Sequence, residues 1–434
     1  MGKALFLNVS GGGHVIATYG LVAELLRRGE EVIYYEVPRF QREIEALGAE
    51  FRPYPEIRPY PGPLARYRYH HELDLAPILT WCALEWLPQL LEPARRAAPD
   101  YVVHDSLCIW GRVIARLLGV PAFCSVHTPA LNWATVLGHP PVWLQLPKMV
   151  LRSFRSMRYF RALERRLRRT YGIGRTSFLD ACTNAQPLNL CHTPRELQPR
   201  ARTFDRRYHF LGSVHHRPTE GTRFPLDRLA DELIYVGFGT ICDPGPRFFR
   251  SCVEALGGLD SQVVMILSDS TSREDLGEIP SNFLVWSLRA DGLAPQLDIL
   301  PRARLFVMNG GMGGARESAW HGVPMIAVPT TFETDLIAVE IQRQGAGLRL
   351  PPGKATPARL RRAARALLDD PAYRHGSRRL GDACRRAGGA ARAADLVLEA
   401  VAACADGAAA LAAGASTPAA SPTPVGSPSH AHPG

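Results

Sequence analysis

Short apolar runs alternate with segments of helical periodicity along most of the chain. Ala4 to Val9 is an apolar run interrupted by Asn8, Ile16 to Arg28 repeats apolar residues at helical spacing, and Glu31 to Val37 is largely apolar again. Continuous apolar runs are typical of parallel strands that are covered on both faces. A strand, a glycine-rich turn, a helix and a second strand begin a doubly wound α/β domain. The pattern therefore predicts an α/β fold with a parallel sheet.

The same alternation continues through the second half of the chain. A helical pattern followed by Gly-Val-Pro and an apolar run occurs at Gly119-Val120-Pro121 and recurs at Gly322-Val323-Pro324. Two similar α/β halves are therefore expected in one chain. The further expected strands are Tyr101 to His104, Ala122 to Val126, Leu188 to Cys191, Tyr208 to Leu211, Leu233 to Phe238, Gln262 to Leu267, Phe283 to Trp286, Leu305 to Met308 and Met325 to Val328. The further expected helices are Cys108 to Leu118, Leu151 to Tyr171, Ala315 to Trp320, Pro357 to Leu368 and Arg392 to Ala402.

Composition shifts along the chain predict its domain organisation. We expect an N-terminal domain over residues 1–217, a polar, proline-containing interdomain linker over 218–231, a C-terminal domain over 232–404 and a tail over 405–434. The tail is mainly Ala, Gly, Ser and Pro, which cannot bury a core, so it is predicted to be disordered. Residues 51–75 are rich in Pro, Tyr and Arg and predict a loop. That loop either lies on the surface or shapes an acceptor pocket.

The chain is basic, and this charge bears on possible partners. Its 434 residues carry a formal net charge of +10, which favours acidic small molecules, nucleic acid or an anionic membrane surface. Neither an aromatic-basic RNA motif nor zinc-finger spacing is present, so nucleic acid is not expected as a partner. Arginine is frequent in the helical pattern from Leu151 to Tyr171. This segment is either a solvated helix face or a surface that contacts anionic lipid, as a weak peripheral contact, or an acidic substrate.

Cysteine usage and hydropathy bear on the compartment. The nine cysteines are an odd number without a C-x-x-C pair, a pattern that indicates free thiols in a reducing cytosol. The N-terminal apolar run is too short for a signal peptide, and no stretch is long and apolar enough to span a bilayer. A cytoplasmic protein is therefore expected.

The glycine-rich turn Asn309-Gly310-Gly311-Met312-Gly313-Gly314 is the first candidate for chemistry. It follows an apolar strand pattern and precedes a helical one. In that position backbone N–H groups and the helix dipole can face an anion such as a diphosphate. The alternative is a tight strand-to-helix turn that binds nothing. No cluster of residues has metal-ligand spacing, so no metal site is expected.

Several separated motifs carry a family resemblance from about Lys3 to Ala402. They are GGGHVIATYGLVAELLRRGEEVIYY, HDSLCIWGRVIARLLGVPAF, LNLCHTPRELQP followed by YHFLGS, LIYVGFGT, LAPQLDILPRA and NGGMGGARESAWHGVPM. In this order they resemble the macrolide-type glycosyltransferases, which are UDP-glycosyltransferase-like enzymes of the GT-B fold. The resemblance implies two Rossmann-like doubly wound parallel-sheet domains that face a cleft.

The resemblance also implies an activity. It indicates a metal-independent, inverting hexosyltransferase that moves a sugar from a UDP- or dTDP-sugar to a hydroxyl of a lipophilic natural product such as a polyketide. No cofactor is implied beyond this nucleotide-sugar co-substrate. The family's general base falls on His14, and the aspartate that orients it falls on Asp105. The structural alternatives are a loop histidine bonded to backbone and an aspartate that caps the following helix.

The family's donor-binding residues fall in the second half. By resemblance, Gly239 and Thr240 approach the phosphates, Ala294 and Gln296 hold the base and ribose, and Glu317 accepts the ribose hydroxyls. The turn residues Asn309, Gly310, Gly311, Gly313 and Gly314 would bind the diphosphate, and Glu333 with Thr334 would read the sugar.

The chain also departs from the family pattern. Asn309 stands where the family usually has histidine, Gly313 and Gly314 where polar residues often contact phosphate, and Thr334 where an amide is usual. Leu293 stands where an aromatic often stacks on the base. These departures keep a second hypothesis open, in which the chain is a non-catalytic GT-B-fold binding or auxiliary protein.

Overall fold

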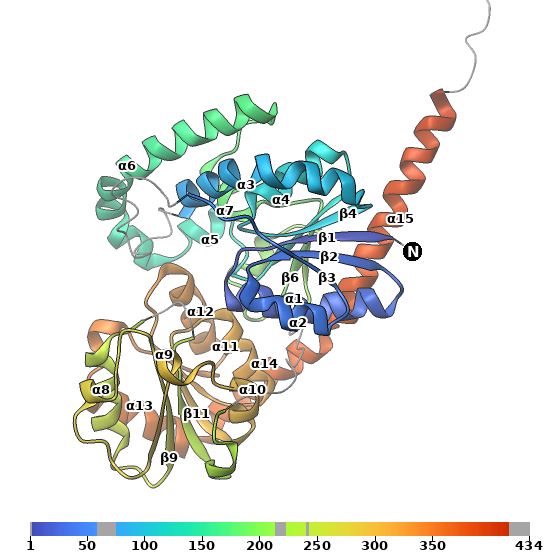
Figure 1. The fold of residues 1–434 in the computed structure, drawn as a ribbon. Helices are drawn as coiled ribbons and strands as arrows, with labels where there is room; N and C mark the ends of the chain where they lie inside the picture. Colours follow the sequence, from blue (N-terminus) through green and yellow to red (C-terminus); the bar gives the residue numbers. More distant parts are fainter. Residues whose placement is uncertain (1, 59–74, 213–222, 240–242, 416–434) are drawn as a thin grey trace, which may run out of the picture.

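Two α/β domains make up the protein, one above the other in Figure 1. The computed structural model describes residues 2–58, 75–212, 223–239 and 243–415, and Thr240 lies outside these ranges. Each domain is built around a parallel sheet with helices on its faces.

The N-terminal sheet has seven parallel strands in the order β3-β2-β1-β4-β5-β6-β7. These strands are β1 (Lys3–Leu7), β2 (Glu31–Glu36), β3 (Glu50–Pro53), β4 (Tyr101–Asp105), β5 (Ala122–Val126), β6 (Leu188–Cys191) and β7 (Tyr208–Phe210). The helices are α1 (Gly12–Arg27), α2 (Gln41–Ala46), α3 (Leu75–Ala97), α4 (Ile109–Leu118), α5 (Trp133–Leu137), α6 (Pro140–Tyr171) and α7 (Phe178–Thr183). The order changes direction between β1 and β4, and this switch point is where doubly wound sheets bind ligands.

The C-terminal sheet has six parallel strands in the order β10-β9-β8-β11-β12-β13. These strands are β8 (Leu233–Val236), β9 (Gln262–Leu267), β10 (Phe283–Ser287), β11 (Ala303–Met308), β12 (Met325–Ala327) and β13 (Gly347–Arg349). The helices are α8 (Pro246–Leu256), α9 (Leu288–Asp291), α10 (Gln296–Ile299), α11 (Met312–Trp320), α12 (Phe332–Arg343), α13 (Pro357–Asp369), α14 (Pro371–Arg386) and α15 (Gly389–Ala415). The predicted doubly wound architecture is confirmed in both halves.

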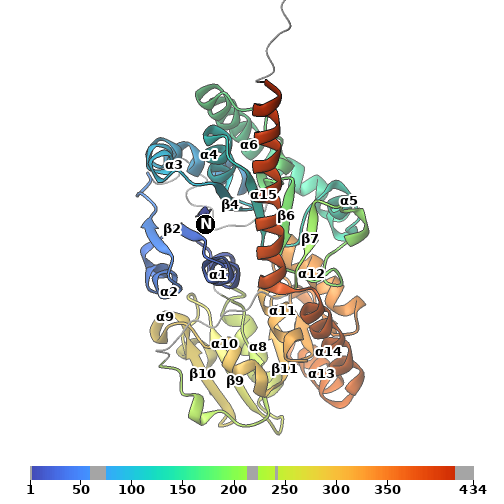
Figure 2. The ribbon, with the colours of Figure 1, turned by 90° about the vertical axis from the view of Figure 1, so that its right-hand side faces the viewer.

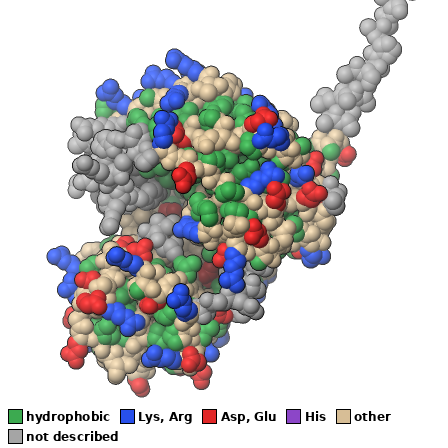
Figure 3. All heavy atoms as spheres, viewed as in Figure 1, with side chains coloured by type: hydrophobic (Ala, Val, Ile, Leu, Met, Phe, Trp, Pro, Cys, Tyr) green, Lys and Arg blue, Asp and Glu red, His purple; other side chains and the backbone are tan. Residues whose placement is uncertain are grey.

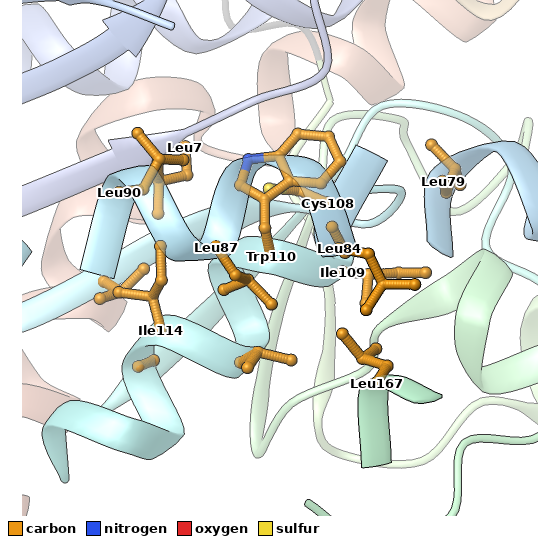
Figure 4. Close-up of a cluster of buried hydrophobic side chains, with 14 of the residues drawn as sticks. Leu7, Leu79, Leu84, Leu87, Leu90, Cys108, Ile109, Trp110, Ile114 and Leu167 are labelled. Carbon is orange, nitrogen blue, oxygen red and sulfur yellow. The ribbon is translucent and has the colours of Figure 1, made fainter. Parts of the chain in front are cut away.

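Helix α4 is anchored in the core that covers one face of the N-terminal sheet. Figure 4 shows Trp110 of α4 among leucines of α3, with Leu7 of β1 nearby. The Trp110 indole N–H donates to the hydroxyl of Tyr54 over 3.1 Å, so its one polar atom is satisfied although the ring is buried. This packing fixes α4 directly after Asp105, the last residue of β4.

The segment over residues 51–75 of the first domain differs from the sequence prediction. The predicted loop over residues 51–75 includes most of β3, an edge strand paired with β2, and α3 follows directly after it. Residues 59–74 lie outside the described ranges, so the acceptor-pocket hypothesis for this loop stays a prediction. Phe51 lies opposite Tyr34 in the pairing with β2, and proline at Pro53 stands at the end of an edge strand, where its missing N–H costs nothing.

The predicted linker is wrong for the part that the structure describes. Phe224 and Leu229 are buried in the core of the C-terminal domain, and the side chain of Gln262 on β9 bonds to backbone atoms of Arg228 and Ala230. Residues 223–231 therefore pack as part of the second domain, because their apolar side chains find a core there. Residues 213–222 lie outside the described ranges.

Helix α15 returns to the N-terminal domain, which corrects the predicted boundary at residue 404. Figure 2 shows it running across the upper domain beside β6. Ala393, Ala394 and Val397 share a buried cluster with Leu21 and Leu25 of α1. These small and branched side chains at helical spacing let α15 pack closely on α1. The helix also continues to Ala415, past the predicted start of disorder at residue 405, whereas residues 416–434 lie outside the described ranges.

Deletion of residues 405–434 is expected to leave the melting temperature and activity unchanged. Residues 402–406 are exposed, so the end of α15 buries nothing there. Deletion from Ala393 onward is the matched control, because it strips Val397 and its neighbours from the core. Each large buried side chain of this kind contributes roughly 1.5–3 kcal/mol. Thermal melting followed by circular dichroism measures both, and a lower melting temperature for the shorter deletion would show that the tail packs on the domain.

The surface shows charges of both signs. On the face in Figure 3, Lys and Arg side chains lie among Asp and Glu side chains over both domains. Helix α6 buries Phe160, Leu163 and Leu167 and exposes Arg158 and Arg161 among its arginines. This is an amphipathic helix with a basic solvent face, and contact with anionic lipid stays a prediction.

Among the described residues no helix has the length and apolar character needed to cross a membrane. Every cysteine in the described ranges is a free thiol.

Candidate active site

Polar side chains line the carboxyl edge of the N-terminal sheet, at and around the switch point. Asp105 ends β4, His127 follows β5, His192 follows β6, and His14 lies in the first turn of α1 after β1. Because the strands are parallel, their carboxyl ends meet at one edge of the sheet. The side chains are therefore neighbours although they come from four separate segments.

His14 and Asp105 are in direct contact. Nδ1 of His14 lies 2.6 Å from Oδ2 of Asp105, and the carboxylate is fully buried. Oδ1 of the same carboxylate accepts the backbone N–H of Leu107 over 2.6 Å. Asp105 therefore holds His14 with one oxygen and the turn before α4 with the other, but it does not cap α4, whose N-cap residue is Cys108. A carboxylate on Nδ1 holds the hydrogen there and leaves Nε2 as the acceptor nitrogen.

Burial and charge act in opposite directions on His14. Burial of the ring lowers its pKa, but the charge of Asp105, its hydrogen bond and the charges of Glu333 and Glu36 raise the pKa further, so the net shift is upward. Glu333 belongs to α12 of the C-terminal domain. The charged groups that act on His14 therefore come from both domains.

Glu36, the last residue of β2, is a carboxyl group that the sequence analysis did not single out. It is fully buried, and Oε2 accepts the backbone N–H of Val37 over 2.6 Å while Oε1 has no hydrogen-bond partner. Burial raises its pKa to about 7. Glu36 is therefore a second group near His14 that can change its charge close to neutral pH.

The rings of His14, His127 and His192 form a row beside Asp105, and Nε2 of His127 lies 3.6 Å from Oδ2 of that aspartate. The rings of His14 and His127 lie 5.4 Å apart, and those of His127 and His192 stack at 4.4 Å. Nε2 of His192 lies 2.7 Å from the hydroxyl of Ser125, whereas neither ring nitrogen of His127 has a hydrogen-bond partner. Burial lowers the pKa of His192 to about 3 and that of His127 well below its ordinary value, so both rings are neutral.

The glycine-rich turn lies at the carboxyl end of β11, and its residues differ in role. Gly311 is the N-cap of α11, and its N–H donates to the side-chain oxygen of Asn309 over 3.0 Å. Gly310 has φ +80°, and a Cβ there would lie 2.6 Å from the carbonyl of Thr334. Gly313 faces open space, with no atom within 4 Å of a Cβ position. The turn is therefore open for a ligand at Gly313.

Gly314 has a packing role in the structure. A Cβ at Gly314 would lie 3.1 Å from Met308 and 3.3 Å from Phe306, both on β11. Its missing side chain thus lets α11 pack on the sheet. Gly314 can offer only its backbone groups to a ligand, and its part in binding the diphosphate stays a prediction.

Gln296 and Glu317, two predicted ribose-binding residues, are in contact. The amide of Gln296, at the start of α10, donates to the carboxylate of Glu317 on α11, and its oxygen accepts from the hydroxyl of Tyr235 over 3.3 Å. Glu317 is partly buried, and burial raises its pKa. Ala294 packs against the hydrophobic core of the C-terminal domain, which includes Tyr235. The structure therefore brings three predicted donor residues together beside the glycine-rich turn.

Glu333 and Thr334 begin α12 but differ in what their side chains do. The hydroxyl of Thr334 accepts the backbone N–H groups of Thr330 and Thr331, and Thr331 in turn caps the N–H of Thr334. The Thr334 hydroxyl thus belongs to a capping box, and its role in reading the sugar stays a prediction. Gly239 lies after β8 with φ +68°, and Thr240 lies outside the described residues.

Several residues of this site could have been found from the sequence. Glu36, His127 and His192 each end or directly follow an otherwise apolar strand, a position that favours ligand binding in parallel sheets. Arg316, one residue before Glu317, is a buried cation that was not singled out. Within the described ranges no group of His, Cys, Asp or Glu is arranged to hold a metal ion.

Comparisons with known proteins agree over most of the chain. The family described as "Erythromycin biosynthesis protein CIII-like, C-terminal domain" matches residues 250–388. The oleandomycin glycosyltransferase of Streptomyces antibioticus is 31% identical over 379 residues, which are 86% of this chain and 85% of the relative. The demethyllactenocin mycarosyltransferase of Streptomyces fradiae is 29% identical over 88% of this chain and 82% of the relative. The crystal structure of the glycotransferase of kitacinnamycin is similar with a TM-score of 0.76 and 28% identity, over 91% of this chain and 98% of that chain.

Proposed function

We propose a specific reaction for this chain, which belongs to the macrolide-type UDP-glycosyltransferase family and is a glycosyltransferase. It moves a sugar from a UDP- or dTDP-sugar to a hydroxyl group of a lipophilic natural product. By their names, two of the relatives above transfer sugars in connection with oleandomycin and demethyllactenocin. The observation that carries the proposal is the contact of His14 with Asp105, in a site whose charge includes Glu333 of the other domain.

The proposed reaction is a single displacement. Nε2 of His14 takes the proton from the acceptor hydroxyl as its oxygen attacks the anomeric carbon of the donor. The bond between that carbon and the diphosphate oxygen breaks, and its electron pair leaves with the nucleoside diphosphate. The new bond forms on the opposite face of the sugar, so the configuration inverts. Asp105 holds the imidazole in the receptive tautomer and stabilises the imidazolium that forms.

The donor would bind on the C-terminal domain. The start of α11 offers backbone N–H groups and the positive end of a helix dipole to the diphosphate, and Gly313 leaves room for it to approach. Glu317 and Gln296 would hold the ribose hydroxyls, and Glu333 would contact the sugar. Gly239 and Thr240 are proposed to lie near the phosphates.

Glu317→Ala is expected to weaken binding of UDP or dTDP by roughly tenfold or somewhat more, the usual worth of hydrogen bonds to a charged acceptor. Isothermal titration calorimetry of wild type and variant measures this. Glu254→Ala is the matched control, because Glu254 is exposed on α8 and should leave the affinity unchanged. Unaltered nucleotide affinity in Glu317→Ala would remove Glu317 from the site.

A second candidate function rests on one observation. The side-chain oxygen of Asn309 accepts the N–H of Gly311, so a donor that could face a phosphate is already occupied. This favours a non-catalytic binding or auxiliary protein with an altered donor site. The same calorimetry decides between the two, since a wild-type protein that binds no nucleotide would contradict the transferase and support the auxiliary role.

A further inference from the structure

Arg316 is a buried cation that the proposed mechanism does not use. The residue is 5% exposed, and its guanidinium donates through Nη1 to the backbone carbonyl of His192 in the other domain. Nε has no hydrogen-bond partner, and among the described residues no carboxylate forms an ion pair with the group. Burial lowers the pKa of Arg316, and the charge of Glu317 opposes only part of this effect. A buried guanidinium without an ion pair is costly, because the interior solvates charge poorly. The arrangement therefore requires an explanation.

The position of Arg316 on α11 indicates where its charge is directed. Side chains on a helix lean toward its N-terminus, so the side chain of Arg316 is directed back toward the first turn of α11. Gly313 faces open space. The guanidinium also lies close enough to His127 and His192 to lower the pKa of both rings, although burial has the larger effect on each. Arg316 therefore lies between the first turn of α11 and the histidine row.

The glycine-rich turn itself supplies no charge. Its six residues from Asn309 to Gly314 are all uncharged, and the N–H of Gly311 is bonded to Asn309. Departure of a nucleoside diphosphate leaves additional negative charge on the phosphate oxygens, which a nearby cation stabilises. Arginine suits this task because its planar fork can bind phosphate oxygens with two parallel hydrogen bonds while a third N–H remains on His192.

We propose that Arg316 binds the diphosphate of the nucleotide donor and supplies the positive charge that this subsite otherwise lacks. Its bond to the His192 carbonyl means that the same side chain spans the two domains, so a bound diphosphate is held where the N-terminal histidines lie. This inference rests on the proposed function, because it assumes a nucleotide donor. It adds a charge-bearing binding residue outside the glycine-rich turn.

Arg316→Gln is expected to weaken the affinity for UDP or dTDP by roughly 10- to 100-fold, and to change the affinity for the matching nucleoside by less than about twofold. Arg316→Lys keeps the charge but loses the fork, so its affinity should be intermediate. Arg385→Gln is the matched control, because Arg385 lies over Trp320 at the other end of α11 and is exposed. Calorimetry with nucleoside and nucleoside diphosphate measures all four proteins, and thermal melting checks their folding.

Three results would overturn the inference. If Arg316→Gln binds the diphosphate as tightly as wild type, Arg316 does not contact it, and the proposed function is unaffected. If diphosphate and nucleoside lose affinity equally, Arg316 only supports the fold. If wild type binds no nucleoside diphosphate, the proposed function fails together with this inference. Should Arg316→Gln not fold, Arg316→Lys decides, since an unchanged preference for diphosphate over nucleoside in that variant would contradict a forked contact.

Discussion

Replacing His14 with alanine is expected to reduce the turnover number by roughly two to four orders of magnitude, the usual contribution of a general base. The affinity for the nucleoside diphosphate should stay nearly unchanged, because His14 lies on the N-terminal domain and the donor residues lie on the other. Steady-state assays with a defined donor and acceptor measure the first quantity, and calorimetry measures the second. His375→Ala is the control, since His375 is exposed on α14.

The pH profile of the wild-type enzyme tests the same role independently. His14 must be neutral to accept a proton, so activity is lost as pH falls and the ring becomes protonated. Asp105, Glu333 and Glu36 raise its pKa against the opposing effect of burial. The midpoint of the acid limb is therefore expected above the ordinary histidine value of about 6.5. Wild-type turnover in His14→Ala, or an acid limb well below that value, would contradict the assignment.

Most of the fold was predictable, because parallel strands that are covered on both faces have mainly apolar sequences. Leu233 to Val236 and Gln262 to Leu267 are examples whose burial matches the pattern. The docking of α15 was not predictable. Its apolar positions Ala393, Ala394 and Val397 show that one face is covered, but nothing in that pattern says which domain covers it. Phe224 is a second example, because an apolar ring in a polar segment does not indicate which domain buries it.

The candidate site also has parts that the sequence predicts and parts that it does not. Contact between His14 and Asp105 was predictable from two separate family motifs, and the pairing of β1 with β4 in the sheet brings the two residues together. The row through His127 and His192 depends on the order of β4, β5 and β6, which no local pattern determines. The part of Thr334 in the start of α12 was also predictable, because Thr331 stands three residues before it, a spacing typical of a capping box.

Asp105→Asn is expected to lower turnover about as much as loss of His14, on the order of 10⁴-fold, although the amide has almost the shape of the carboxylate. The amide oxygen can still accept the N–H of Leu107, so the start of α4 and the melting temperature should be preserved. The amide nitrogen would then face Nδ1 of His14 and donate to it. The ring must in response carry its hydrogen on Nε2, where it can no longer accept a proton from the acceptor.

This reversal of the tautomer makes the double variant informative. If Asp105 acts only through His14, then His14→Ala combined with Asp105→Asn should be no slower than the slower single variant, because residues that act as a unit are not additive. Steady-state turnover of the two single variants and the double variant measures this, with melting temperatures as the check on folding. Multiplying losses would show that Asp105 acts on the reaction independently of His14. A turnover of Asp105→Asn near that of wild type would remove the pair from the mechanism, since the buried contact at 2.6 Å would then hold the ring without affecting proton transfer.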